Sequence, residues 1–404
     1  MLPATQATME AASTQQPNET TLPKSPFSLH FSQPFFMPLP GAIFDLAKEK
    51  HRVLDGMNSE NWYLVTTPVL ASMKVPVLRA VGEGSLSKDF QQPGPIREAL
   101  KATAENSRNR PGTYALVLAE KNWESPTARE PLDAIKTVRA YCGTGAQADK
   151  LAAKVGTQMN NRRNSRVKAL PPDHRRYLAK KSDGRVSSAK RDMILEFCTE
   201  LENRLRGLPN LDDPIEYPLF YFGWSANLQQ RINQHTNHQS SNETVDLFHA
   251  ALMLFFESRG SRILAFPLCF LTKPAQSAIA EVLFTVLGNG YRPYGFNSRP
   301  TCLNNDSANT IHSQGWALNA AYIQYATPFV LNMQNEERYI KISTQVIGET
   351  MWAELERAVQ PVEMDYSECD AALDRLNATF ARLDKMEARI DELSDFPLLD
   401  EIHA

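Results

Sequence analysis

The stretch of sequence that decides the fold is Tyr217–His235, YPLFYFGWSANLQQRINQH. Residues 219–222 are apolar and aromatic, which predicts a short buried strand. Gly223 is expected to let the backbone turn, and either Ser225 or Asn227 can cap the helix that follows. The stretch therefore predicts a strand that leads directly into a helix.

The predicted helix carries two functional side chains on one face. Arg231 and His235 are four residues apart, so they lie one helical turn from each other. An arginine and a histidine on a helix most often form a solvated surface. Here the preceding strand ends close to Tyr221, which brings a phenol into the same small volume. This combination predicts a site built from a phenol, a guanidinium and an imidazole.

The composition is that of a globular protein. Of 404 residues, 42% are hydrophobic and 22% are charged, and this length allows two domains. No apolar run approaches the roughly 18 residues that a membrane helix needs, and the N-terminus lacks the apolar region of a secretory signal. Five scattered cysteines argue against a disulfide framework or a zinc site. We therefore expect an intracellular protein, nuclear or cytoplasmic, with no membrane partner.

Residues 150–191 are strongly basic, although the net charge of the whole chain is −3. They include thirteen lysines and arginines and only two aspartates. This excess predicts either a solvated, flexible insertion or a surface that binds phosphates and releases their counterions. Two basic pairs in this interval also loosely match a two-part nuclear import signal. The candidate nucleic-acid contacts are Arg162, Arg163, Arg166, Arg175, Arg176, Lys180 and Lys181.

Two short motifs resemble those of the GIY-YIG nuclease family. Residues 221–223, Tyr-Phe-Gly, are similar to the family's Tyr-Ile-Gly, and Arg231 lies ten residues after the first of them, where the family's catalytic arginine falls. His235 follows four residues later, as in several homing and restriction members of the family. Residues 112–114, Gly-Thr-Tyr, stand before a predicted strand and resemble the family's Gly-Ile-Tyr.

The spacing of the two motif tyrosines departs from the family. Tyr114 and Tyr221 are 107 residues apart, whereas the family leaves only a short hairpin between its two tyrosines. If both belong to one sheet, a long insertion separates their strands. Tyr141, in Tyr-Cys-Gly, is an alternative second tyrosine that is nearer to Tyr114. The tenth residue after it is Leu151 rather than an arginine, so Tyr221 is preferred.

Glu281 and Asn297 extend the resemblance downstream. Glu281 follows Arg231 by fifty residues and precedes Asn297 by sixteen, intervals similar to those of the family. Glu281 is the one carboxylate on a predicted helix that is otherwise largely apolar. Burying that carboxylate is costly unless a cation pairs with it, whereas a carboxylate that faces solvent needs no explanation. The resemblance implies that Glu281 binds Mg²⁺ (or Mn²⁺). Asn297 is expected to hold the site together rather than to take part in the chemistry.

The activity that the resemblance implies is that of a metal-dependent endonuclease, acting on DNA rather than RNA. Tyr114 would take a proton from the attacking water, with Tyr221 hydrogen-bonded beside it. Arg231 would bind the nonbridging phosphate oxygens, and His235 would orient the water or bind phosphate. An unperturbed phenol has a pKa of about 10, so a nearby cation must lower it for catalysis at neutral pH.

Two other functions also fit the sequence. The first is a nucleic-acid-binding module that has the same fold and no turnover. The second is an interaction or scaffold protein that acts through its C-terminal segment. Apolar residues recur every seven positions in residues 371–393, which predicts an amphipathic helix for self-association or for a partner helix.

The expected fold is α/β (α+β), with a small three-stranded antiparallel sheet flanked by helices and with helical additions. Tyr114, Tyr221 and residues 263–271 are expected on its three strands. The predicted domains are a disordered N-terminus at 1–26, a region of unknown role at 27–110, a GIY-YIG-like nuclease domain at 111–300 with a basic insertion at about 145–210, a helical extension at 301–365, and a C-terminal amphipathic helix or coiled coil at 366–404.

Overall fold

The computed structural model describes residues 38–48, 56–162, 175–179, 185–237, 242–255, 262–298, 313–326 and 328–338, with isolated residues elsewhere. The chain divides into two compact units, residues 1–332 and 333–404. All the helices and strands named below belong to the first unit. The predicted disorder at 1–26 lies outside the described residues, as does the predicted helix at 371–393 apart from four isolated positions.

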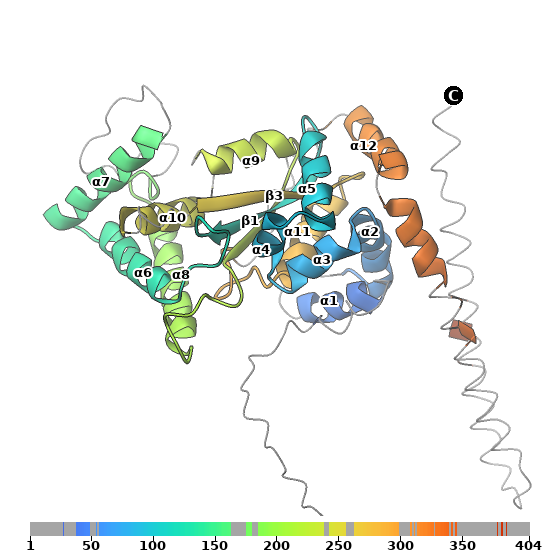
Figure 1. Ribbon diagram of the computed structural model, residues 1–404, viewed down its shortest axis with the longest axis horizontal. Coiled ribbons are helices and arrows are strands. Elements are labelled where there is room, and N and C mark those ends of the chain that lie inside the picture. Colours follow the sequence, from blue (N-terminus) through green and yellow to red (C-terminus); the bar gives the residue numbers. More distant parts are fainter. Residues whose placement is uncertain are drawn as a thin grey trace, which may run out of the picture. The chain divides into compact units, whose positions relative to one another are not determined.

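A three-stranded antiparallel sheet forms the centre of the first unit (Figure 1). Its strands are β1 (Gly112–Ala119), β2 (Phe220–Ser225) and β3 (Arg262–Phe270), in the order β2-β1-β3. Tyr114 and Tyr221 therefore lie on adjacent strands, and the third strand falls where the sequence predicts it. The predicted sheet is confirmed.

The register of the strands assigns each side chain to one face of the sheet. Tyr114 lies opposite Gly223, and Leu116 lies opposite Tyr221. Paired residues in an antiparallel sheet share a face, and successive residues alternate between faces. Both tyrosines therefore point to one face, and Phe222 points to the other.

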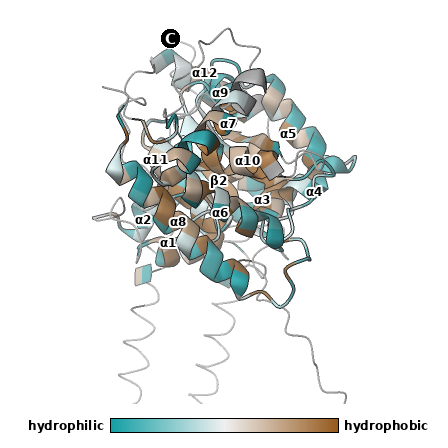
Figure 2. Ribbon diagram, turned by 90° about the vertical axis from the view of Figure 1, so that its left-hand side faces the viewer, coloured by the Kyte–Doolittle hydropathy of each residue, from teal (hydrophilic) through white to brown (hydrophobic). Residues whose placement is uncertain are grey.

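The face that carries Phe222 packs against one helix, which in turn contacts three helices that precede β1 in the sequence. The helix α11 (Gln276–Leu287) lies against β2, and it also contacts α1 (Pro38–Lys48), α2 (Ser59–Ala71) and α3 (Val75–Gly82). In Figure 2 the ribbon around β2 is largely hydrophobic, and hydrophilic turns lie on the outer helices.

The remaining helices before β1 are α4 (Leu86–Gln91) and α5 (Pro95–Glu105), and α5 packs against β3. Within the described residues, no single helix is both long and apolar enough to cross a membrane. By length and composition alone, the pair α2 and α3 would pass that test together, with a bend of 110° between them.

In the described part of the chain between β1 and β2 lie α6 (Arg129–Cys142), α7 (Ala146–Arg162) and α8 (Ser188–Arg206). The helix α6 packs against both of the others, and α6 and α7 pack against α10 (Glu243–Phe255). The ring of Phe197 meets that of Phe248 edge to face, with 5.7 Å between centroids. In its described parts, the chain between β1 and β2 is therefore a folded helical layer.

Tyr141 belongs to this helical layer and not to the sheet. It lies in α6, is 1% exposed, and its hydroxyl accepts a hydrogen bond of 3.2 Å from the backbone N–H of Tyr177. The alternative in which Tyr141 supplies the second strand is therefore wrong. Its role is to pack the helices of the insertion.

Two further helices contact the sheet. The helix α9 (Leu228–Thr236) follows β2 and lies alongside β3 (Figure 1), and it also contacts β1 and β2. From α12 (Ser313–Ala326), the buried Asn319 donates hydrogen bonds of 2.8 Å to the carbonyls of Pro111 and Leu271. These bonds join α12 to the start of β1 and the end of β3.

Candidate functional site

Gly223 makes room for Tyr114 and does not turn the chain as expected. It lies inside β2, opposite Tyr114. A Cβ at this position would stand 2.7 Å from the Tyr114 hydroxyl oxygen and 2.9 Å from its Cζ. Glycine is therefore required because the tyrosine ring crosses directly over the neighbouring strand.

The helix α9 begins at a capping residue that fixes its side chains relative to β2. The side chain of Asn227 accepts a hydrogen bond of 3.1 Å from the N–H of Gln230, which satisfies one free donor of the first turn. Of the two expected caps, Asn227 is thus the one used. Ser225 instead donates a hydrogen bond to the carbonyl of Asn227.

The hydroxyl of Tyr114 is the point where four of the predicted site residues come together. Its oxygen lies 2.9 Å from Nε2 of His235, and Nε of Arg231 donates to it over 3.4 Å. The ring of Tyr221 lies beside both, 6.2 Å from the Tyr114 centroid and 5.8 Å from that of His235. The structure therefore brings together one residue from each of two strands and two from α9.

Burial keeps both tyrosines neutral in the folded protein. It raises the pKa of Tyr114 to about 12, and the nearby positive charge of Arg231 only partly opposes this effect. The pKa of Tyr221 is also raised well above its ordinary value, first by burial and then by Tyr114 and Glu281. A phenolate at this site therefore requires additional positive charge.

His235 is buried against the hydroxyl of Tyr114. Its side chain is 0% exposed, and burial, followed by the charge of Arg231, lowers its pKa to about 3. It is therefore a neutral imidazole that touches Tyr114 from inside the protein. The contact that the structure shows for it is with the Tyr114 hydroxyl, and its role in orienting water or binding phosphate stays a prediction.

Arg231 remains charged and is held from two sides. Its guanidinium donates a hydrogen bond of 3.1 Å to Oε1 of Gln234 as well as the longer one to Tyr114. Burial alone would lower the pKa of Arg231, but the two tyrosines and Glu281 raise it overall. Gln234 is a site residue that the sequence analysis missed, although its place three residues after Arg231 could have suggested a contact.

Glu281 contributes a negative charge from α11. It is half-buried, and it raises the pKa values of Tyr114, Tyr221 and Arg231. No cluster of three or more His, Cys, Asp or Glu side chains suited to a metal occurs in the described part of the chain. Mg²⁺ is commonly held by one or two carboxylates, with waters and substrate phosphates completing its shell. Glu281, close enough to act on the charge of both tyrosines, could supply the one carboxylate that such a site needs.

Asn297 holds β2 in place. Its Oδ1 accepts a hydrogen bond of 2.9 Å from the N–H of Phe222, and its Nδ2 donates one of 2.7 Å to the carbonyl of the same residue. Asn297 is 1% exposed. It therefore pairs with the open edge of the strand, which agrees with the structural role expected for it.

The structure describes few of the predicted nucleic-acid contacts. Arg175 is only 6% exposed, because Asp149 accepts a hydrogen bond of 2.7 Å from its guanidinium and the carbonyl of Tyr141 accepts one of 3.0 Å. It lies inside the insertion, contrary to the exposed position that its predicted role requires. Arg176 is half-buried over the ring of Tyr177. Outside the described side chains lie Arg162, Arg163, Arg166, Lys180 and Lys181.

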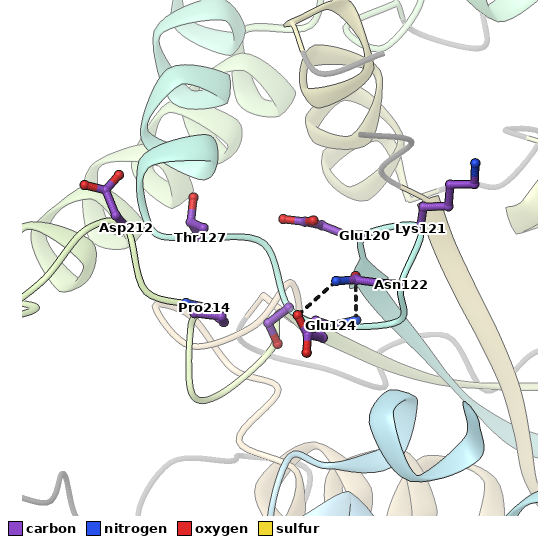
Figure 3. A pocket seen from close by; sticks show the side chains of 8 residues that line it. Glu120, Lys121, Asn122, Glu124, Thr127, Asp212 and Pro214 are labelled. Carbon is purple, nitrogen blue, oxygen red and sulfur yellow. Dashed lines mark hydrogen bonds between the residues drawn. The ribbon is translucent and has the colours of Figure 1, made fainter. Parts of the chain in front are cut away.

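A separate hollow of about 400 Å³ lies beyond the other end of β1 (Figure 3). Its lining includes Glu120, Lys121, Glu124 and Asp212. Glu120 is six positions after Tyr114 along an extended chain, a distance of roughly 20 Å. The hollow is therefore distinct from the tyrosine site.

Comparisons of the chain with protein-family models, with curated proteins and with solved structures found no match.

Proposed function

We propose that this protein is a metal-dependent endonuclease that hydrolyses phosphodiester bonds in DNA, and that it is a diverged relative of the GIY-YIG nucleases. The observation that carries the proposal is the hydroxyl of Tyr114, which lies within hydrogen-bonding distance of both Arg231 and His235. Tyr221 on the adjacent strand and Glu281 on α11 supply the remaining groups of the site. Tyr114 would be the proton acceptor of this set, Arg231 its fixed positive charge and Glu281 its carboxylate.

Arg231 has the position and charge to stabilise the transition state. Attack of water on a phosphodiester increases the negative charge on the nonbridging oxygens. A guanidinium binds two such oxygens at once. Its contacts with Gln234 and Tyr114 hold it in place before substrate binds, so little reorganisation is needed during the reaction.

Tyr114 would take the proton from the attacking water. Its pKa of about 12 must fall for this step at neutral pH, and a donated hydrogen bond to its oxygen favours the phenolate. Arg231 already donates one, and the neutral imidazole of His235 can donate another from Nε2. Mg²⁺ held by Glu281 would add positive charge beside the phenol and stabilise the leaving 3′ oxygen.

A second function, an inactive nucleic-acid-binding module, is favoured by the burial of the site. The Tyr114 side chain is only 1% exposed. A buried phenol with a pKa of about 12 serves well as part of a stable hydrogen-bonded core. In that case the same residues would maintain the fold without turnover.

A cleavage assay separates these two functions. Purified full-length protein should nick duplex DNA when Mg²⁺ or Mn²⁺ is present, and a chelator should stop the reaction. Glu281→Gln keeps the size of the side chain and removes its charge, so cleavage should collapse. Arg231→Ala should lower the rate by about 10²–10³-fold. Glu98→Gln, an exposed carboxylate on α5, is the matched control and should cleave like the parent.

Two results would count against the proposal. If the parent cleaves no duplex, branched or single-stranded substrate with either metal ion, the inactive module is the correct function. If Glu281→Gln cleaves as fast as the parent, Glu281 does not hold the metal.

A further inference from the structure

The surface of α9 that faces away from the sheet is unusually rich in side-chain amides. Residues 227–237 contain six asparagines and glutamines, one arginine, and no lysine or carboxylate. Gln230 and Asn233 are exposed, whereas Gln229 and Gln234 are half-buried beside them. Together with Arg108 and Asn109, these four residues form what we call the amide face.

Residues 106–110 are joined to α9 by direct hydrogen bonds. Ser107 Oγ donates to Oε1 of Gln229 over 2.8 Å, and Nδ2 of Asn227 donates to Oδ1 of Asn109 over 2.9 Å. Within the helix, Nε2 of Gln229 donates to Oδ1 of Asn233 over 3.1 Å. The segment and the helix therefore present one connected surface.

The charge of this surface suits a polyanion. Residues 106–110 carry two arginines and α9 carries one, and neither segment contains an acidic residue. The first carboxylate before them along the chain is the exposed Glu105, at the end of α5. Arginine, asparagine and glutamine are the side chains that most often contact both phosphates and base edges in DNA complexes.

The amide face is also continuous with the proposed catalytic site. Gln230 and Gln234 flank Arg231 on the same helix, and Arg231 reaches Tyr114. If Arg231 binds the phosphate that is cleaved, the exposed amides stand within one helical turn of it, which is about 5 Å. Any base that they contact is therefore close to the cleavage position.

We infer that the amide face enters the major groove of duplex DNA beside the cleaved phosphate and makes binding depend on the base sequence. This inference rests on the proposed function. The major groove of B-form DNA admits an α-helix, and asparagine or glutamine pairs with the edge of adenine through two hydrogen bonds. The major groove of duplex RNA is too narrow for this contact. Arg108, exposed at one side, binds a phosphate and adds affinity without sequence preference.

The test uses the full-length Glu281→Gln protein, so that binding is measured without cleavage. Its binding to a library of short DNA duplexes with a randomised centre is measured at two salt concentrations. The amide variant is Gln230→Ala with Asn233→Ala, and the charge variant is Arg108→Gln. The matched control is Gln91→Ala with Gln92→Ala, which removes two exposed amides that precede α5 in the sequence.

The two variants should fail in different ways. The amide variant should lose sequence preference, by roughly 5- to 150-fold for each lost pair of hydrogen bonds, and should keep most of its affinity for random duplexes. Arg108→Gln should bind all sequences more weakly and reduce the slope of log affinity against log salt by about one. The control should match the parent in both respects.

The inference is overturned if the amide variant keeps the preference of its parent, or if the parent prefers duplex RNA or binds no duplex DNA. These outcomes are separable from failure of the proposed enzyme. A chain that shows sequence-dependent binding through the amide face but never cleaves would support this inference and overturn the proposed nuclease activity. If the parent cleaves DNA but the amide variant keeps the sequence preference of the parent, the nuclease activity is supported and this inference is overturned.

Discussion

The two faces of the central sheet differ in what they are built to do. Toward α9, Tyr114 and Tyr221 meet Arg231 and His235 through hydroxyl and ring contacts. Toward α11, the neighbouring residue Phe222 packs against the glycines after that helix and stacks at 5.2 Å on Phe220. Residues 221 and 222 are adjacent in sequence, yet one faces the proposed chemistry and the other faces the core.

Glycines adapt each face to a large ring, but with different consequences. Gly223 leaves room for the polar ring of Tyr114, whereas Gly290 leaves room for Phe222, where a Cβ would stand 2.7 Å from the phenylalanine ring. On the first face, the close approach positions a hydroxyl for hydrogen bonding. On the second, it removes apolar surface from water. Substitutions of Phe222 should therefore change stability, and substitutions of the residues that meet at the Tyr114 hydroxyl should change activity or its pH dependence.

Phe222→Ala should have the largest effect on stability of the changes considered. Phe222 is 1% exposed, so its loss leaves a cavity that costs about 3–5 kcal/mol of the free energy of unfolding. Denaturant unfolding followed by circular dichroism measures this cost. Tyr221→Phe, one residue away on the other face, removes only a hydroxyl and should cost less than about 1.5 kcal/mol.

The two faces would not differ in this way if the two substitutions had similar effects on stability. If Tyr221→Phe destabilises the protein as much as Phe222→Ala, the tyrosine face is a structural core and not a site.

His235 should make the free energy of unfolding depend on pH, and this effect should be smaller than the effect of Phe222→Ala. Its pKa is about 3 in the folded protein and about 6.5 in an unfolded chain, so the unfolded state binds the proton more readily. His235 therefore supports stability above about pH 6.5, and this support is lost as the pH falls toward 3, by at most about 1.4 kcal/mol per pH unit. Unfolding experiments between pH 7 and pH 4 should show the decline, and His235→Gln, which does not titrate, should show less of it.

Phe222→Leu is the matched variant on the other face. It should be less stable at every pH and should keep the pH dependence of the parent. A His235→Gln protein that declines as steeply as the parent would show that other groups cause the acid sensitivity.

Much of the site could be predicted because short-range patterns determine it. The alternation of a strand and the four-residue repeat of a helix are enough to place Tyr221, Arg231 and His235 together. The pairing of Tyr114 with the same sheet needed the resemblance to a known motif, since 107 residues separate it from Tyr221.

What could not be predicted depends on distant contacts. The sequence around Gly223 suggested a turn, because nothing in it shows that a tyrosine from another strand crosses that glycine. Arg175 looked like a solvated charge, because Asp149 and the carbonyl of Tyr141 approach it only in the folded insertion. The burial of His235 likewise follows from the packing of α9 on the sheet and not from its own helix.

The most direct test of the account is the cleavage rate of Tyr114→Phe. This change keeps the ring over Gly223 and removes only the oxygen that Arg231 and His235 contact. With Mg²⁺ and duplex DNA, we expect the rate to fall by at least about 10²-fold, the usual contribution of a general base, while DNA affinity stays unchanged. A Tyr114→Phe protein that cleaves as fast as the parent would contradict the central claim that this hydroxyl takes part in the reaction.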